Sequence, residues 1–469
     1  MSTTYSAPSG PGWKGDALSN NVFDTIRGGF RSGVSRDPGA RVALLKRIRD
    51  FILRERDALT AALFEDLGKS ETEALMCEIM PVLQVLNLLI RKTVSWSAPR
   101  RAAVSVLNFP ATGRIVPEPF GTVLVVSAWN YPLLLALEPL AGALAAGNCV
   151  ILRPHPAAAA TAVMLKKLVA ECASPEQCAC LDDPPEELAG WGFDYVFFTG
   201  GAPKGRKVAA AAAGNLTPFT LELGGKSPCI VSESCDLKLA ARRIAWGKFL
   251  NAGQTCVAPD YVLAEQGIMD DLKLELRNAI TEFYGPDPEA SPDYPRIISD
   301  WHFNRLVTLL GEGRLVAGGE HNSAARYIAP TVIDNVKPDS EIMSSEIFGP
   351  ILPLLPVDGI REAVDFINAR PKPLALYLFT NRRDERRTVI RETSSGSVAV
   401  NDTVMQIMNP AFPFGGVGES GCGAYHGKLT FQCFCHMKPV MKKCRSPELP
   451  VRFPPFLSWK RKLARLVCR

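Results

Sequence analysis

Residues 121–152 contain a single charged residue, Glu138, and this apolar stretch constrains the fold more than any other part of the chain. Its length would suit a membrane span. However, Trp129-Asn-Tyr-Pro132 interrupts it, and Gly142 and Gly147 divide the remainder. Residues 123–126 and 149–152 are typical of buried strands, and residues 133–146 of a buried helix. The stretch therefore predicts a strand–helix–strand unit covered on both faces, in which parallel strands have nearly continuous apolar runs.

The same alternation continues along the chain and predicts an α/β fold with parallel sheets. Residues 37–66 have apolar positions at helical spacing, and residues 72–92 predict a second helix with a kink at Pro81. Residues 101–119 predict a hairpin arm, because Pro110 and Gly113 separate short β-like runs. Further strands are expected at 194–198, 220–223 and 228–231, and a second alternating region at 246–409.

Composition places the chain among ordinary globular proteins of two or three domains. It has 469 residues, of which 47% are hydrophobic and 22% charged. Its 13 cysteines form no disulfide framework, and the two Cys-x-Cys pairs with only five histidines offer no zinc site. We therefore expect reduced thiols and a cytoplasmic location, and residues 1–20 lack the apolar segment of a secretory signal.

Positive charge is concentrated at the C-terminus. From Lys442 onward there are nine Lys/Arg and one acidic residue, whereas the rest has 44 basic and 47 acidic residues, which argues against a nucleic-acid partner. In residues 456–469, apolar side chains recur every three to four residues among basic ones, which predicts peripheral contact with an anionic membrane. Cys468 is a candidate for acylation. The alternative is a solvated tail that packs on a second subunit.

Cys256 and Glu222 indicate covalent catalysis. Cys256 ends Asn251-Ala-Gly-Gln-Thr-Cys256, and Glu222 begins Glu222-Leu-Gly-Gly-Lys226. A lone cysteine is usually a small buried hydrophobe. A glycine-flanked thiol preceded by a glycine-flanked carboxylate instead provides a nucleophile and a base that hydrolyses its acyl adduct.

Two glycine-rich segments compete as a phosphate-binding loop. Gly416-Val-Gly418-Glu-Ser-Gly421 matches G-x-G-x-x-G but lacks a clean strand before it and helix-forming residues after it, so we interpret it as a structural loop. Gly200-Gly-Ala-Pro-Lys-Gly205 lacks the consensus spacing. It does follow a predicted strand and opens an alanine-rich helix, which is the context in which a helix N-terminus faces phosphate.

Several motifs together make the chain resemble the aldehyde dehydrogenases, in particular their class 3 or fatty-aldehyde branch. The motifs occur in family order over roughly residues 37–440: Pro119-Phe-Gly121, Trp129-Asn-Tyr-Pro132, Ala146-Gly-Asn148, Phe198-Thr-Gly200, Leu221-Glu-Leu-Gly-Gly-Lys-Ser-Pro228, Gly253-Gln-Thr-Cys256, Glu346-Ile-Phe-Gly-Pro350, Pro413-Phe-Gly-Gly416 and Tyr425-His-Gly427. The resemblance implies a Rossmann-type nucleotide domain (1–96 and 117–222), an α/β catalytic domain (223–410), a bridging region (97–116 and 411–440) that forms a homodimer, and a basic tail (441–469).

The resemblance also implies the roles of individual residues. Cys256 would attack the aldehyde, Asn130 would stabilise the oxyanion, and Glu222 would activate water. Tyr131 and Trp246 would lie near the aldehyde tunnel, although core packing is an open alternative for both. NAD or NADP would be bound by residues in four segments: Arg153, Gly200, Gly205, Leu223, Gly224, Glu346 and Phe348.

The departures from the family pattern fall in the cofactor half. Arg153-Pro-His-Pro156 replaces the usual Lys-Pro-Ser-Glu, so the carboxylate that would hold the adenosine ribose is missing and NADP should be tolerated. Gly201 replaces a serine, and residues 178–185 lack the expected apolar strand. The resemblance implies oxidation of medium- or long-chain aliphatic or aromatic aldehydes to acids. The alternatives are a thiol esterase with weak cofactor binding and a non-enzymatic binding protein on the same fold.

Overall fold

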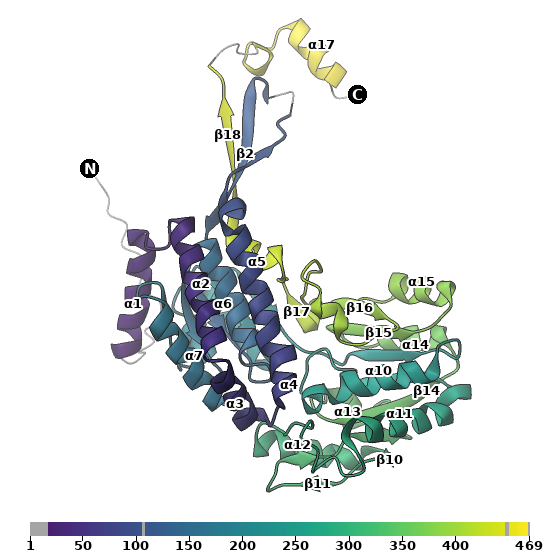
Figure 1. The fold of residues 1–469 in the computed structure, drawn as a ribbon. Helices are drawn as coiled ribbons and strands as arrows, with labels where there is room; N and C mark the ends of the chain where they lie inside the picture. Colours follow the sequence, from purple (N-terminus) through teal and green to yellow (C-terminus); the bar gives the residue numbers. More distant parts are fainter. Residues whose placement is uncertain (1–16, 106–107, 446–449, 468–469) are drawn as a thin grey trace.

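The computed structural model describes residues 17–105, 108–445 and 450–467. Two parallel-stranded sheets form the body, and a narrow antiparallel arm projects from it (Figure 1). The α/β architecture expected from the sequence is confirmed. The domain limits implied by the resemblance remain a prediction.

The first sheet has the strand order β17-β7-β6-β3-β4-β5. Its strands are β3 (Thr122–Val126), β4 (Cys149–Arg153), β5 (Cys178–Cys180), β6 (Tyr195–Thr199), β7 (Phe219–Glu222) and β17 (Gly421–Cys422). All are parallel except β17, which pairs antiparallel with β7. The order reverses between β3 and β6, and ligands of such sheets bind beyond the carboxyl ends of the strands at this reversal.

Helices cover both faces of this sheet because the residues of its central strands alternate between two cores. Val123 and Val125 pack into the core of one face, whereas Leu124 and Val126 pack into the core of the other. The first face carries α2 (Pro38–Arg54), α3 (Arg56–Leu67), α4 (Glu71–Ala74), α5 (Met80–Ser97), α6 (Leu134–Ala146) and α7 (Ala159–Cys172). The second carries α1 (Ala17–Ser32), α8 (Pro185–Ala189) and α9 (Ala202–Gly214).

The second sheet has the order β10-β13-β14-β9-β8-β15-β16. Its strands are β8 (Pro228–Val231), β9 (Tyr261–Glu265), β10 (Arg314–Ala317), β13 (Thr331–Asp334), β14 (Ile351–Val357), β15 (Ala375–Phe379) and β16 (Ser397–Val400). Only β10 is antiparallel to its neighbour. The accompanying elements are α10 (Leu237–Phe249), α11 (Met269–Tyr284), α12 (Asp300–Leu309), β11 (His321–Asn322), β12 (Tyr327–Ile328), α13 (Glu341–Ser344), α14 (Ile360–Asn368) and α15 (Arg383–Glu392).

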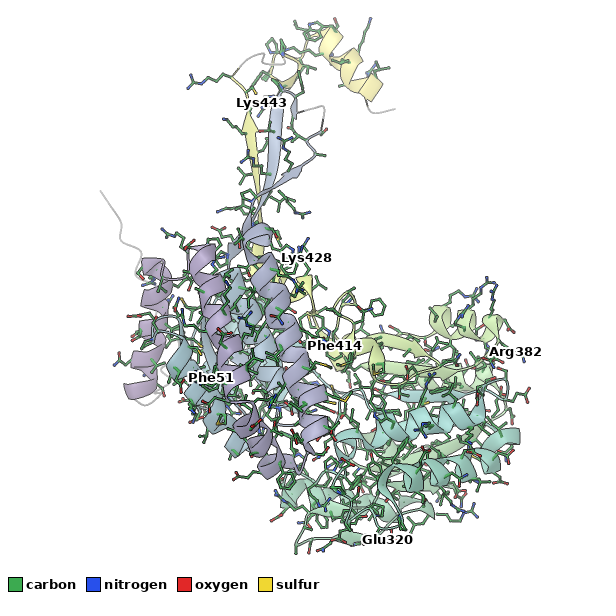
Figure 2. The ribbon with its side chains drawn as sticks, viewed as in Figure 1. Phe51, Glu320, Arg382, Phe414, Lys428 and Lys443 are labelled. Carbon is green, nitrogen blue, oxygen red and sulfur yellow. The ribbon has the colours of Figure 1, made fainter. Side chains whose placement is uncertain are left out.

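The arm has three antiparallel strands: β1 (Arg100–Ala102), β2 (Ala111–Pro119) and β18 (Cys435–Lys443). The predicted hairpin is present as β1 and β2, and β18 adds a strand from the far end of the chain. Lys443 lies on the arm and Lys428, in α16 (Lys428–Gln432), lies at its base (Figure 2). The tail forms α17 (Ser458–Val467) at the tip of the arm (Figure 1).

Two local expectations were wrong. Residues 37–66 form two helices, because the first ends with Glu55 as its C-cap. The predicted kink at Pro81 falls where the helix changes its winding: a π-helical turn, η1 (Leu75–Ile79), directly precedes α5, whose second residue is Pro81. Residues 178–180 do form a strand, since β4 supplies a parallel partner at the sheet edge.

The continuous helix over Glu71–Ser97 is long and apolar enough to cross a membrane by length and composition alone. Its inner face packs on α2 and α6. Leu86 and Leu89 on that face are completely buried. A core helix of a globular domain has the same properties, so this helix is weak evidence for a span.

Candidate active site

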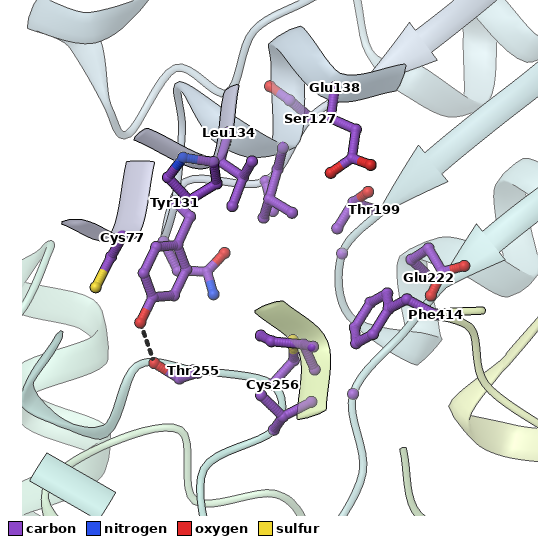
Figure 3. A pocket seen from close by; sticks show the side chains of 18 of the residues that line it. Cys77, Ser127, Tyr131, Leu134, Glu138, Thr199, Glu222, Thr255, Cys256 and Phe414 are labelled. Carbon is purple, nitrogen blue, oxygen red and sulfur yellow. Dashed lines mark hydrogen bonds between the residues drawn. The ribbon is translucent and has the colours of Figure 1, made fainter. Parts of the chain in front are cut away.

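A large cavity lies beyond the carboxyl ends of β3, β4, β6 and β7 and extends between the two sheets. Its volume is about 1220 Å³. Cys256, Glu222 and Asn130 all line it, together with most of the residues expected to bind a cofactor or substrate. Figure 3 shows Cys256 facing Phe414 and Tyr131, with Glu222, Thr199, Ser127 and Glu138 in an arc along one side.

Cys256 follows a strained loop. Within η3 (Leu250–Gly253), which follows α10, the φ angles of Asn251, Ala252 and Gly253 are all positive, at 52°, 50° and 73°. Such a run of left-handed residues persists only where surrounding contacts impose it. Gln254 supplies them, because its Nε2 donates to the carbonyl of Arg296 (3.0 Å) and its Oε1 accepts from the amide of Ile298 (3.0 Å).

The environment of Cys256 disfavours the thiolate. Burial raises the pKa of the Cys256 thiol to about 12, and the carboxylates of Glu346 and Glu222 act in the same direction. The backbone amides of Cys256 and Val257 oppose this shift. Because its pKa is raised, the Cys256 thiol is protonated at neutral pH, and it must lose its proton before or as it attacks.

Asn130 is fixed beside the Cys256 segment. It is 2% exposed, and its Nδ2 donates to the carbonyl of Gln254 at 3.0 Å. Its own carbonyl accepts from Asn251 Nδ2 at 2.8 Å and from Lys69 Nζ at 2.8 Å. An amide nitrogen carries two N–H donors, so one remains available toward the cavity.

Lys69 and Glu78 form a completely buried ion pair behind Asn130, with 2.5 Å between Nζ and Oε1. Glu78 Oε2 also accepts from the amides of Leu133 (2.8 Å) and Leu134 (3.2 Å), at the start of α6. The pair thus joins the η1 turn to the segment that carries Asn130. The sequence analysis missed both residues, since a Lys and a Glu near helix ends look like surface charges.

Glu222 is the last residue of β7 and is 3% exposed. No described residue donates a hydrogen bond to either carboxylate oxygen. Burial raises the pKa of this carboxyl well above its usual value, and the carboxylate of Glu138 adds to the shift. A carboxyl of this kind is a stronger base than an exposed one and requires a route for its proton.

Glu346 and Phe348 lie in the loop before β14. Lys226 anchors this loop through Asp260 (2.5 Å), whose Oδ1 accepts from the amide of Ile347 (3.0 Å). Burial raises the pKa of the Glu346 carboxyl to about 8. That carboxylate occupies the space that a Cβ at Gly224 would need, so a larger residue there would displace the Glu346 side chain.

The remaining predicted cofactor residues cluster at the sheet reversal. Gly200 and Leu223 line the cavity beyond β6 and β7, and Arg153 lines it beyond β4. Arg153 Nε donates to the carbonyl of Asp183 at 3.2 Å, and burial lowers the pKa of the guanidinium. Gly205 does not line the cavity: it lies inside α9, where a Cβ would overlap Leu223. Gly205 therefore allows α9 to pack closely against Leu223.

An apolar wall faces Cys256. Tyr131 is buried, and its hydroxyl lies 2.7 Å from Thr255 Oγ1. Trp246 lies on α10 and lines the cavity. Other large apolar residues that line the cavity include Met76, Met80, Leu88, Leu134, Leu250, Met405, Ile407 and Met408.

The second glycine loop lies outside this cavity. Residues 416–421 form η7 (Gly418–Ser420) and enter β17, and none of them lines the cavity. In the described part of the chain, no group of three or more His, Cys, Asp or Glu side chains could hold a metal ion.

The chain belongs to the aldehyde dehydrogenase family, whose family model matches residues 21–440. Within that family it is similar to the family 3 enzymes, and it is an NAD(P)-dependent dehydrogenase that oxidises aldehydes to carboxylic acids. The non-enzymatic alternative raised by the sequence is thereby set aside.

Two curated relatives and one solved structure illustrate the similarity. Aldehyde dehydrogenase family 3 member A2 of Pongo abelii is 42% identical over 435 residues, 92% of this chain and 90% of the relative. The rat enzyme named "Aldehyde dehydrogenase, dimeric NADP-preferring" is 41% identical over 93% of this chain and 99% of its own length. The structure "Substrate bound state of Staphylococcus Aureus AldH" is 40% identical, with a TM-score of 0.94 over 96% of this chain and 99% of that one.

Proposed function

We propose that this dehydrogenase oxidises medium- and long-chain aliphatic or aromatic aldehydes through a covalent adduct on Cys256. One observation carries the proposal: a thiol, a buried carboxylate without partners and an anchored amide meet in a single cavity with an apolar wall. An apolar wall favours aldehydes with a hydrocarbon body, because burying each CH₂ contributes about 0.8 kcal/mol.

In the first step, Cys256 Sγ adds to the aldehyde carbon and the thiol proton passes to solvent water. The carbonyl oxygen becomes an oxyanion, which the free N–H of Asn130 and the backbone N–H of Cys256 would stabilise. One such donor typically contributes about 3 kcal/mol to the transition state. The hydrogen bond from Asn130 to Gln254 supports this role, because it fixes the amide beside the Cys256 segment before substrate arrives.

A bound NAD or NADP would supply the hydride acceptor that converts the Cys256 adduct to a thioester. The residues present fit such a group: Gly200 and Leu223 lie at the sheet reversal where nucleotides bind, and Glu346 is a buried acceptor for hydroxyl groups. We propose that Arg153, Gly224 and Phe348 complete the site. Gly205 would act indirectly, by letting α9 pack closely on Leu223.

Glu222 would then activate the water that hydrolyses the thioester. The water oxygen bonds to the acyl carbon, the C–S bond breaks, and Glu222 takes the proton. Its burial and its raised pKa support this assignment, since both make it a stronger base.

Assembly and location are also proposals. One rat relative is named dimeric, and we propose that this chain forms a homodimer through the arm and residues 411–440. We further propose that it is cytoplasmic and contacts the cytoplasmic face of a membrane through residues 456–469. Sedimentation equilibrium tests the first point, and a monomer at micromolar concentration would contradict it.

The decisive experiment measures reduced nicotinamide from the purified protein with hexanal, decanal and benzaldehyde, using NAD and NADP in parallel. We expect turnover with all three, and a kcat/KM that rises from hexanal to decanal. Turnover of short polar aldehydes alone would contradict the proposed substrate class.

A further inference from the structure

Four buried polar atoms beside Glu222 lack protein partners. They are Ser127 Oγ, Thr199 Oγ1 and the two carboxylate oxygens of Glu222, and no group in the described ranges bonds to any of them. All three residues line the active-site cavity along the arc seen in Figure 3. Buried polar atoms are nearly always hydrogen-bonded, so where protein partners are missing and the site is roomy, water molecules fill the place.

Glu138, from α6, lies on the same arc and is 3% exposed. Its Oε1 accepts a hydrogen bond from Thr430 Oγ1 at 3.0 Å, and its Oε2 lies 3.5 Å from His426 Nε2. Gly142 allows this contact, because a Cβ there would overlap the carbonyl of Thr430 and push α6 away from α16. Glu138 therefore lies between these four unpartnered polar atoms and His426.

His426 connects this arc to a second, smaller pocket. It lines both the active-site cavity and a pocket of about 110 Å³ that also includes Phe412, whose side chain is 54% exposed. Its ring stacks on Phe414, with centroids 5.1 Å apart, and its φ of 83° is left-handed. A strained backbone and a stacked ring hold the imidazole in place between the two spaces.

We propose that Ser127, Thr199, Glu138 and His426 form a proton relay that restores Glu222 to its basic form after each turnover. The proposal rests on the role of Glu222 proposed above. Ser127 and Thr199 hold the connecting water, Glu138 passes the proton on, and His426 delivers it to solvent through the smaller pocket.

The proton balance of hydrolysis requires such a route. Water loses one proton as its oxygen bonds to the acyl carbon, and Glu222 holds that proton when the C–S bond breaks. Before the next cycle the proton crosses the bridging water to Glu138, moves from Oε2 to His426 Nε2, and leaves to solvent water or a buffer base. No electron is transferred in this sequence. The sulfur of Cys256 leaves as a thiolate and takes up the proton of the newly formed carboxylic acid, which departs as a carboxylate, so Cys256 and Glu222 both end as they began.

Several groups face Glu138 and set its charge. Burial raises the pKa of its carboxyl, whereas His426 and Thr430 lower it. Glu222 lines the same cavity and adds to the negative charge there. Burial raises the pKa values of Tyr425 and Cys433, and the carboxylates of Glu138 and Glu222 raise them further. Because the pKa values of both the Glu138 and the Glu222 carboxyl are raised, both can hold a proton near neutral pH, which suits transfer between them through a bridging water.

The first test is Glu138→Gln, which keeps the acceptor for Thr430 but cannot carry the proton. We expect kcat to fall about tenfold across pH 6–9 with KM for aldehyde unchanged. The control is Glu385→Gln, a buried carboxylate that likewise accepts from a threonine, Thr380, far from the cavity, and it should keep wild-type kcat. If Glu138 only tuned the charge on Glu222, the substitution would move the pH profile toward acid without lowering its plateau, and the relay would be wrong.

The second test is His426→Ala, which opens space for a soluble base. We expect kcat to fall in a non-nucleophilic buffer and to recover with added imidazole in a saturable manner, while the melting temperature stays near that of the wild type. A kcat within twofold of wild type in both variants, or no recovery with imidazole, would overturn the relay. Failure of the relay is distinguishable from failure of the proposed chemistry, because the latter would also leave Glu222→Gln fully active.

Discussion

The side chain of Asn130 donates a hydrogen bond to the backbone carbonyl of Gln254, two residues before Cys256. The return contact, from Asn251 Nδ2 to the carbonyl of Asn130, ties the same two segments together at 2.8 Å. The amide and the thiol segment are therefore positioned by each other and by the Lys69–Glu78 pair, independently of the thiol itself. A reacting side chain, such as the thiol of Cys256, can therefore be substituted by itself while the segment that carries it stays in place.

Cys256→Ala should abolish both aldehyde oxidation and hydrolysis of activated esters such as nitrophenyl acetate. We expect losses on the order of 10³-fold or more, because removing a nucleophile eliminates the covalent route. The fold should be unchanged, since the loop is held by Gln254 and Asn251. Cys422→Ala, at an exposed thiol, is the matched control and should stay active. Retention of more than a trace of oxidation in Cys256→Ala would contradict the assignment.

Glu222→Gln should separate acylation from hydrolysis. The amide cannot take a proton from water, so the thioester should form but persist. We expect a pre-steady-state burst of reduced cofactor approaching one per active site, followed by a steady rate lower by about 10²-fold. Stopped-flow absorbance measures both phases. An unchanged steady rate would rule out Glu222 as the base.

Alkylation of Cys256 in the nucleotide-free protein should be slow and strongly dependent on pH. Because burial raises the pKa of its thiol to about 12, the reactive thiolate fraction should rise about tenfold per pH unit between pH 7 and 10. Peptide mapping after timed iodoacetamide treatment measures the extent of alkylation at Cys256 and at the exposed Cys422 and Cys444. We expect the two exposed thiols to be modified first at pH 8. Faster modification of Cys256 than of Cys422 at pH 8 would show that the thiolate is already stabilised.

NADP should be used at least comparably to NAD. Pro156 replaces the carboxylate that would repel a 2′-phosphate, and the buried guanidinium of Arg153 lies in the cavity nearby. We expect Arg153→Gln to weaken the binding of NADP by about tenfold more than the binding of NAD, since the hydrogen bonds between an arginine and a phosphate are charge-assisted. The matched control is Arg206→Gln, at an exposed arginine paired with Glu419. A kcat/KM for NADP more than about a hundredfold below that for NAD would refute the prediction.

Deleting residues 456–469 should remove binding to anionic membranes. Phe456, Trp459, Leu463 and Leu466 are all exposed, at 57%, 47%, 42% and 67%. Each nearby Lys or Arg contributes about 1 kcal/mol at an acidic leaflet. Lys460 is an exception, since it is buried and donates to the carbonyl of Phe453 at 2.7 Å.

Liposome flotation of the full and truncated chains measures this difference. We expect only the full chain to float with phosphatidylserine vesicles at low salt, and neither with neutral vesicles. Equal partitioning of both forms would remove the membrane proposal. Val467 and Cys468 of the predicted apolar and acylated set have side chains outside the described region, so acylation stays a prediction.

The sequence was most informative where burial is complete. The unit formed by β3, α6 and β4 could be predicted because both faces are covered, which leaves apolar runs that only a covered strand–helix–strand arrangement explains. The split at Glu55 could not, since Arg54-Glu55-Arg56 contains no helix breaker. What ends the helix there is tertiary packing, including that of α3 on α7.

The residues of the site likewise divide into those that sequence motifs predict and those that only the structure reveals. Cys256, Glu222 and Asn130 could be chosen from motifs, and the structure places all three at one cavity, although their roles remain to be tested. Glu138 was visible only as a lone charge in an apolar stretch. Its contact with His426 joins positions 288 residues apart, and no local pattern predicts a contact of that kind.

Strands β17 and β18 lie near the C-terminal end of the sequence, and this position has a consequence for the synthesis of the protein. Strand β17 closes the edge of the sheet beside Glu222, and Phe414, Tyr425 and His426 complete the cavity wall, all from the last eighth of the chain. A nascent polypeptide still missing this part carries the nucleophile and the base but has an open sheet edge and an unfinished pocket. The ribosome must therefore release nearly the whole chain before any molecule can turn over an aldehyde, and until then the exposed edge of β7 is a point at which chaperones or neighbouring chains can bind.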